Sequence, residues 1–168
     1  TSPVLSYEDG GKQVAFIQRN GSTGTLQLVL LKWAAGQGSA GAPAAPSVAA
    51  NAADYATART NAGSAMYVMT LNGTSNTGNV PTYSSPFVDY VDDVLWVGDG
   101  NGRLHKFTGV FKGTPAEVVG GGFPATLEAG LKLSPPVSNN GQVYIGSSAG
   151  AATVGGKLYR VNASTGVV

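Results

Sequence analysis

Acidic and amide side chains at 99–102 come closest to a metal-binding pattern. The segment Asp-Gly-Asn-Gly resembles the start of a calcium loop, and three further aspartates precede it at positions 89, 92 and 93. Calcium takes about six to eight oxygen ligands, and the bidentate glutamate that closes such a loop is missing here. A hairpin turn explains the same residues without an ion. We therefore expect no cofactor; if calcium binds, Asp99 and Asn101 are the first ligands that we predict.

A second candidate for chemistry is the segment Gly146–Gly150, which matches the G-x-S-x-G pattern of a nucleophilic serine. That pattern needs a strand, a sharp turn and a helix, followed by an acid and a histidine. Here a Gly/Ala-rich loop follows, and the only histidine, His105, lies upstream. We therefore predict a strand turn at 146–150, a packed or surface position for His105, and neither a catalytic residue nor an enzymatic activity.

Three Asn-x-Ser/Thr triplets begin at Asn20, Asn72 and Asn162. Each falls at a predicted turn, where a glycosylation site would be accessible. Such triplets also arise readily by chance in a chain rich in Asn, Ser and Thr. The three asparagines are therefore predicted glycan acceptors only in a host that glycosylates asparagine.

Charge and composition argue against two classes of partner. Of the 168 residues, 11% are charged and 42% are hydrophobic, and the formal net charge is +1. No basic cluster is present to neutralise phosphates, so nucleic acid is not an expected partner. No run approaches the roughly 20 apolar residues of a membrane span, so membrane insertion is not expected. The chain has no cysteine and therefore no disulfide.

The strands that must position these side chains follow a repeating layout. The stretch Ser84–Phe107 contains a short apolar strand, an acidic turn, an apolar strand, a Gly-rich turn and a third strand, and the same order recurs at Ser134–Val161 and near the N-terminus. Repetition at a period of roughly 40–50 residues is typical of a propeller-type array. We predict an all-β fold with β-propeller blades: about three four-stranded antiparallel meander units, at 1–35, 83–125 and 126–168.

An Ala/Gly/Pro-rich insertion at 36–64 separates the first unit from the second. Its first part, 36–46, has the composition of a flexible linker. A short helix is predicted to follow, with Ser47 as its N-cap and with its end near Arg59. An extra strand and a loop follow at 65–82. In the second unit, segments 109–111 and 115–119 are expected to supply the outer strand.

The C-terminal half carries a resemblance to a known family. The segment QVYIG at 142–146, followed by GKLYRVNASTG at 156–166, resembles the repeat of quinoprotein-like propellers, the PQQ-type repeat. Val94–Gly98 with Gly102–Phe107 matches the same pattern without the closing Thr-Gly. The resemblance implies four-stranded blades around an axis, ligands near the central channel, and a location outside the cell, on a bacterial surface or in the periplasm.

This chain departs from the family's enzymes in several ways. In the family that this chain resembles, the quinone-dependent dehydrogenases commonly carry a docking tryptophan in their blades. Their active sites include a calcium-ligand set, often beside adjacent cysteines. This chain has no cysteine, and its two tryptophans, Trp33 and Trp96, fall inside predicted strands. A quinone- or calcium-dependent propeller enzyme is therefore the least favoured interpretation.

Aromatic side chains allow a further interpretation. Trp33, Trp96, Tyr144 and Tyr159 could line a sugar-binding surface, because aromatic faces stack on sugar rings. However, Trp96 and Tyr144 occupy equivalent places in two units, which favours aromatic packing between blades.

Three units are fewer than the roughly four to eight blades that close a propeller. We therefore expect a fragment of a longer propeller, or completion of the ring by copies or partner chains. The leading functional prediction is a non-catalytic extracellular or periplasmic scaffold that recognises a protein or glycan partner through its loops. The alternative is a structural subunit of a surface filament or layer, because exposed blade faces and edges favour self-association.

Overall fold

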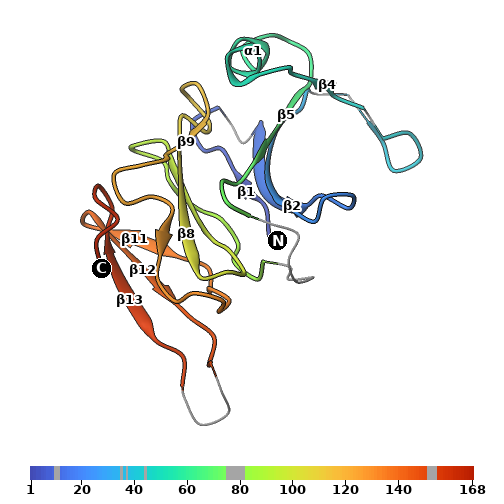
Figure 1. The fold of residues 1–168 in the computed structure, drawn as a ribbon. Helices are drawn as coiled ribbons and strands as arrows, with labels where there is room; N and C mark the ends of the chain where they lie inside the picture. Colours follow the sequence, from blue (N-terminus) through green and yellow to red (C-terminus); the bar gives the residue numbers. More distant parts are fainter. Residues whose placement is uncertain (10–11, 35, 37, 44, 75–81, 151–154) are drawn as a thin grey trace.

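The fold is all-β, with three sheets and a short helix. The computed structural model describes residues 1–9, 12–34, 36, 38–43, 45–74, 82–150 and 155–168. In Figure 1 the second sheet lies between the first and the third. The expected all-β class is therefore confirmed.

The first sheet contains five strands in the order β1-β2-β3-β5-β4. All neighbours are antiparallel except β4 and β5, which are parallel. The 65–72 segment, expected as an extra strand, pairs with β3 along its length and is thus a member of this sheet. The strands are β1 (Val4–Leu5), β2 (Gln13–Arg19), β3 (Leu26–Lys32), β4 (Ser47–Val48) and β5 (Ala65–Thr70).

The helix within the insertion starts later than the sequence suggested. Ser47 is not its N-cap, because Ser47 and Val48 form β4. Instead Asn51 caps α1 (Ala52–Ala58), and its side-chain oxygen accepts a hydrogen bond from the Asp54 backbone at 2.9 Å. Asparagine is among the best N-cap residues. Residues 47–48 form backbone hydrogen bonds with the edge strand β5 and therefore do not begin the helix.

Two side chains attach α1 to the rest of the molecule. Tyr55 is 0% exposed and enters the core between the first two sheets. Arg59, just past the helix, donates from Nη1 to the carbonyl oxygen of Val110 at 3.2 Å and from Nη2 to that of Gly113. The helical part of the insertion is therefore packed against the sheets.

The second sheet is built around β8, which pairs with β7 on one side and with both β9 and β10 on the other. The expected outer strand at 115–119 is present as β9, but 109–111 forms a loop whose Val110 is fully buried. The strands are β6 (Phe87–Asp89), β7 (Val94–Gly98), β8 (Arg103–Thr108), β9 (Ala116–Glu117) and β10 (Ala125–Thr126).

The third sheet is an antiparallel meander in the order β11-β12-β13. Val143, Ile145 and Val161 point to one face and are buried, while Tyr144 and Arg160, which pair across the sheet, lie on the other face. The strands are β11 (Val137–Asn139), β12 (Gln142–Gly146) and β13 (Leu158–Asn162).

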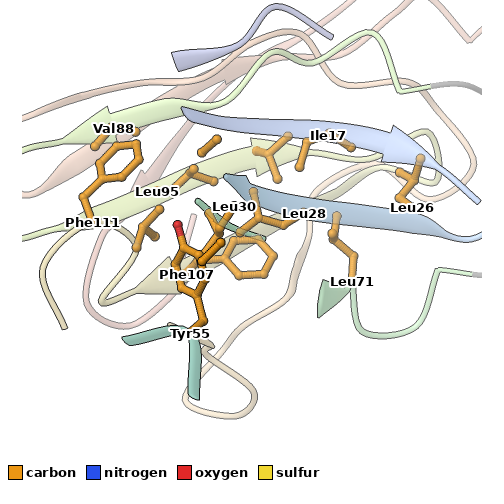
Figure 2. Close-up of a cluster of buried hydrophobic side chains, with 14 residues drawn as sticks. Ile17, Leu26, Leu28, Leu30, Tyr55, Leu71, Val88, Leu95, Phe107 and Phe111 are labelled. Carbon is orange, nitrogen blue, oxygen red and sulfur yellow. The ribbon is translucent and has the colours of Figure 1, made fainter. Parts of the chain in front are cut away.

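Two hydrophobic cores hold the sheets together. The first joins Ile17, Leu28 and Leu30 of the first sheet to Leu95 and Phe107 of the second (Figure 2). The second joins the second and third sheets and contains both aromatic and aliphatic side chains. It is made of Trp96, Leu104, Phe123, Ala125, Leu133, Val143, Ile145 and Val161.

Candidate functional site

A buried cluster of charged side chains lies beside the first core. Asp99 follows β7, Arg103 and His105 lie on β8, and Glu117 lies on β9. His105 is 0% exposed; its Nδ1 lies 2.7 Å from Glu117 Oε1 and its Nε2 3.3 Å from Asp99 Oδ2. The Arg103 Nε donates to the same Asp99 oxygen at 3.2 Å. We call these four residues the histidine cluster.

The histidine cluster connects the second sheet to the end of β5. The Asn72 backbone N–H donates to Glu117 Oε2 at 2.7 Å, and Arg103 Nη2 donates to the carbonyl oxygen of Gly73. Hydrogen bonds with one charged partner are stronger than neutral ones. The cluster therefore reinforces the packing of the first two sheets at this end.

Hydrogen bonding keeps the cluster charged despite its burial. Burial alone lowers the pKa of His105, but hydrogen bonds to Asp99 and Glu117, together with their negative charge, outweigh it and hold this pKa above its ordinary value. Burial raises the pKa of Asp99, but hydrogen bonds from His105 and the Arg103 backbone, with the charges of both side chains, hold it below its ordinary value. The two ring nitrogens of His105 therefore link β8 to β9 and to the turn after β7.

The calcium prediction concerned Asp99 and Asn101, which lie in the turn between β7 and β8. Asp99 Oδ1 accepts hydrogen bonds from the backbone N–H groups of Asn101 at 2.9 Å and Arg103 at 2.8 Å, and Oδ2 faces Arg103 and His105. An ion at Asp99 would have to displace these donors. In the described part of the chain, no three His, Asp or Glu side chains gather in a way that could hold a metal ion. Calcium at this turn stays a prediction.

A second candidate site is a cleft of about 210 Å³ between the first two sheets. It lies at the rim of the first core, where the loop after β1 meets the turn between β6 and β7. We call it the tyrosine cleft. Its chemistry comes chiefly from Tyr7, Glu8, Asp9, Gln13, Tyr90 and Lys112.

The loop after β1 is shaped by Asp9. Its Oδ1 accepts hydrogen bonds from the Ser6 hydroxyl and, at 3.1 Å, from the Lys12 backbone N–H. This closure leaves Tyr7 at the tip with 79% of its surface exposed. Tyr7 lies next to the exposed Tyr90 and Val91, and a contiguous exposed apolar patch, unlike a single apolar side chain, is typical of a contact surface.

The opposite wall of the cleft is shaped by Asp93. Its backbone has a φ of 54°, in the left-handed region that aspartate tolerates better than most residues. Its carboxylate accepts hydrogen bonds from the backbone N–H groups of Phe111 and Lys112 at 2.8 Å and of Gly113 at 3.1 Å. The loop after β8 therefore wraps around Asp93, which brings Phe111 and Lys112 to the cleft.

Three aromatic rings follow one another along the cleft. The Tyr90 ring lies parallel to Phe111, with centroids 6.3 Å apart and planes 9° apart, and the Tyr7 and Tyr90 centroids are 6.1 Å apart. The Tyr90 hydroxyl donates to the Leu5 carbonyl oxygen at 2.7 Å, which fixes the ring against β1. Lys112 Nζ lies 2.8 Å from Glu8 Oε1 and donates to the Tyr90 carbonyl oxygen.

Among the residues of the tyrosine cleft, only Asp93 entered the sequence predictions of functional sites, as one of the acids before the 99–102 segment. A further signal was present, because Tyr7-Glu8-Asp9 and Tyr90-Val91-Asp92 both follow the first strand of their sheet. In both segments an acid lies within two residues of the tyrosine. Only the packing of the two sheets brings the two tyrosines together.

The three predicted glycan acceptors lie at turns, as expected. Asn20 Oδ1 accepts from the backbone N–H groups of Ser22 and Thr23, and Asn162 Oδ1 accepts from those of Ser164 and Thr165. Asn72 is exposed beyond the end of β5. Their glycosylation stays a prediction.

The four aromatic residues considered for sugar stacking do not form one surface. Trp96 is 2% exposed and packs on Phe123, with centroids 5.5 Å apart, in the second core. Tyr159 packs against that core, Tyr144 lies on the opposite face of the third sheet, and Trp33 is 38% exposed beyond β3. The expected packing between sheets therefore holds for Trp96 but not for Tyr144, its predicted equivalent, which faces away from the second core.

Comparisons with protein-family models, curated proteins and solved structures find no match to this chain. Among the described residues, no helix has the length and apolar character needed to cross a membrane.

Proposed function

We propose that this chain is a non-catalytic binding scaffold of the β-propeller type, and that its partner, a protein or a glycan, docks at the tyrosine cleft. The observation that carries the proposal is the exposed aromatic wall of this cleft. Tyr7, Tyr90 and Val91 are 79%, 37% and 88% exposed, and they border a concave site with charged groups beside it. Concave, largely apolar sites with a few placed polar groups are where proteins bind ligands.

Two features support the propeller part of the proposal. Each sheet begins with a short strand, all neighbouring strands except β4 and β5 are antiparallel, and successive sheets pack on each other through a hydrophobic core. The first strands of the second and third sheets, β6 and β11, also contact each other, as the innermost strands of neighbouring blades would. Loops on such a scaffold are held rigidly enough for recognition.

The experiment that tests the binding site uses two exposed tyrosines. Wild-type protein is screened against a glycan array and a defined peptide library, and each hit is titrated again with Tyr7→Ala and with Tyr83→Ala. Tyr83 is 60% exposed but lies outside the cleft, which makes it a matched control. We expect Tyr7→Ala to weaken binding about tenfold or more and Tyr83→Ala to leave it unchanged. Hits that are insensitive to Tyr7→Ala would contradict the proposed site.

A second candidate function, a subunit of a surface filament or layer, is favoured by two apolar sheet faces outside the cores. On the first sheet, half-buried Val14, Phe16, Leu31, Met66 and Val68 lie opposite the core-facing residues. On the third sheet, Val137 and Leu158 are 48% and 77% exposed and share the face of Tyr144. Such faces stack on one another in assemblies.

A further inference from the structure

We propose that the tyrosine cleft binds the guanidinium group of an arginine side chain from a protein partner. This inference rests on the proposed function and specifies it: the partner is a protein, and the group that enters the cleft is a cation with N–H donors. Three independent features carry it, namely an unpartnered buried acceptor, an excess of carboxylates and a row of aromatic rings.

The unpartnered acceptor is the side-chain carbonyl of Gln13, a residue that lines the cleft. Gln13 is 6% exposed, and its Nε2 donates to Asp9 Oδ2 at 2.8 Å and to the Phe111 carbonyl oxygen at 3.0 Å. Both partners can only accept, so the amide orientation is determined and Oε1 faces away from them. Among the described residues, none donates to this buried Oε1. A buried polar atom without a partner destabilises the protein, and a donor on a ligand would remove that cost.

The charge of the cleft favours a cationic donor over a neutral one. Glu8, Asp9 and Asp93 contribute three carboxylates, and Lys112 is the one cation among the described lining residues. Lys112 is already engaged with Glu8 and the Tyr90 carbonyl oxygen. Arg59, outside the lining, also interacts with the charges of Asp93 and Asp9, so the three carboxylates face two cations. A further cation still meets one net negative charge, and a phosphate or carboxylate ligand would be repelled.

The aromatic rings favour a planar cation. Guanidinium groups stack on tyrosine faces and direct N–H donors outward in their plane, where carboxylates and amide oxygens can accept them. In the cleft, the Tyr7 and Tyr90 rings are separated by 6.1 Å and tilted by 50°. An arginine stacked on either ring would have Glu8 and Gln13 within the same cleft as acceptors.

The test compares arginine with its uncharged isostere citrulline. N-acetyl-arginine-amide, N-acetyl-citrulline-amide and methyl glucoside are titrated into labelled protein while the backbone amide signals of Gln13, Tyr90 and Lys112 are followed by NMR. We expect the arginine probe to shift these signals with a Kd of roughly millimolar size, and citrulline to bind at least about fivefold more weakly.

Two glutamate variants serve as a matched pair for this titration. Glu8→Gln removes a carboxylate that is 65% exposed and paired with Lys112, and Glu128→Gln removes an equivalent one that lies 2.7 Å from Lys157 elsewhere. We expect only Glu8→Gln to weaken arginine binding, by about threefold or more. If citrulline binds as tightly as arginine, or if only methyl glucoside shifts the NMR signals, the proposal of a cationic ligand is wrong. The cleft would still be a binding site. Library hits that ignore Tyr7→Ala would instead overturn the proposed function.

Discussion

At the scale of single residues, His105 occupies the packed one of the two positions predicted for it, and its partners are both acids. Its ring is fully buried between Asp99 and Glu117, and their hydrogen bonds hold its pKa above the ordinary value. A group whose pKa is higher in the folded state stabilises the fold in its protonated form. That contribution is complete below the unfolded pKa of about 6.5 and is lost as pH rises through the folded pKa.

Replacing His105 should therefore produce a pH-dependent loss of stability. We expect His105→Gln to lower the free energy of unfolding by about 3–5 kcal/mol near pH 6, because Glu117 loses its cation and Asp99 keeps only Arg103. The difference between wild type and variant should shrink as pH rises from about 6 to 9. Urea denaturation across this range measures it, and His105 is the only histidine in the chain. A difference that stays constant with pH would contradict a charged imidazole.

Asp99 shows the opposite dependence at low pH. Its pKa lies below the ordinary value, so its contribution is present above the unfolded pKa of about 3.9 and is lost as pH falls through the folded pKa. The histidine cluster therefore contributes most between about pH 4 and pH 6.5. Measured with the same denaturation series extended to acid, wild type should lose more stability than Asp99→Asn below about pH 4. Parallel losses in the two proteins would contradict this assignment.

At the scale of elements, the turn between β7 and β8 depends on a glycine for two reasons. Gly102 has a φ of +81°, and its carbonyl oxygen accepts hydrogen bonds from Leu127 at 2.8 Å and Glu128 at 3.3 Å. A Cβ at this position would collide with the Glu128 carbonyl group. The turn thus both closes a hairpin and contacts the segment after β10.

The β11–β12 turn provides a control in which a glycine has a positive φ but no close neighbour. Gly141 has a φ of +71°, but a Cβ there would meet open space. We expect Gly141→Ala to cost about 1–2 kcal/mol from backbone strain alone. Gly102→Ala should cost at least about 2 kcal/mol more, because the Glu128 backbone must also move. Thermal or urea unfolding measures both, and equal costs would show that the close approach is unimportant.

At the scale of the whole molecule, the apolar faces of the first and third sheets lead to a prediction about self-association. If the second candidate function holds, light scattering should show association that increases with concentration. Leu158→Glu should abolish most of it, because a charge buried in an apolar contact is costly. Val119→Glu is the control, since Val119 is 61% exposed on a segment of neither face. A monomer at all concentrations, or equal effects of both substitutions, would contradict assembly through these faces.

Most strands and turns of this chain follow from local sequence, because they depend on neighbouring residues. Alternation of apolar and polar residues located β2, β3 and β12, and Asn-Gly or Asp-Gly pairs located the turns. The exceptions are informative: residues 47–48 became a strand by pairing with β5, and 109–111 became a loop because Asp93 binds the backbone that follows. Both outcomes depend on residues distant in the chain.

The two candidate sites depend instead on how the sheets pack, which brings distant side chains together. Tyr7 and Tyr90 are separated by most of the first unit, the insertion and the 65–82 segment, and Gln13 reaches the Phe111 carbonyl oxygen across a sheet interface. His105 and Glu117 meet because β9 folds back on β8. Local sequence determines which residues can form a strand, but the contacts between side chains depend on how sheets pack. That packing is set by the summed burial of two whole cores and by no short segment.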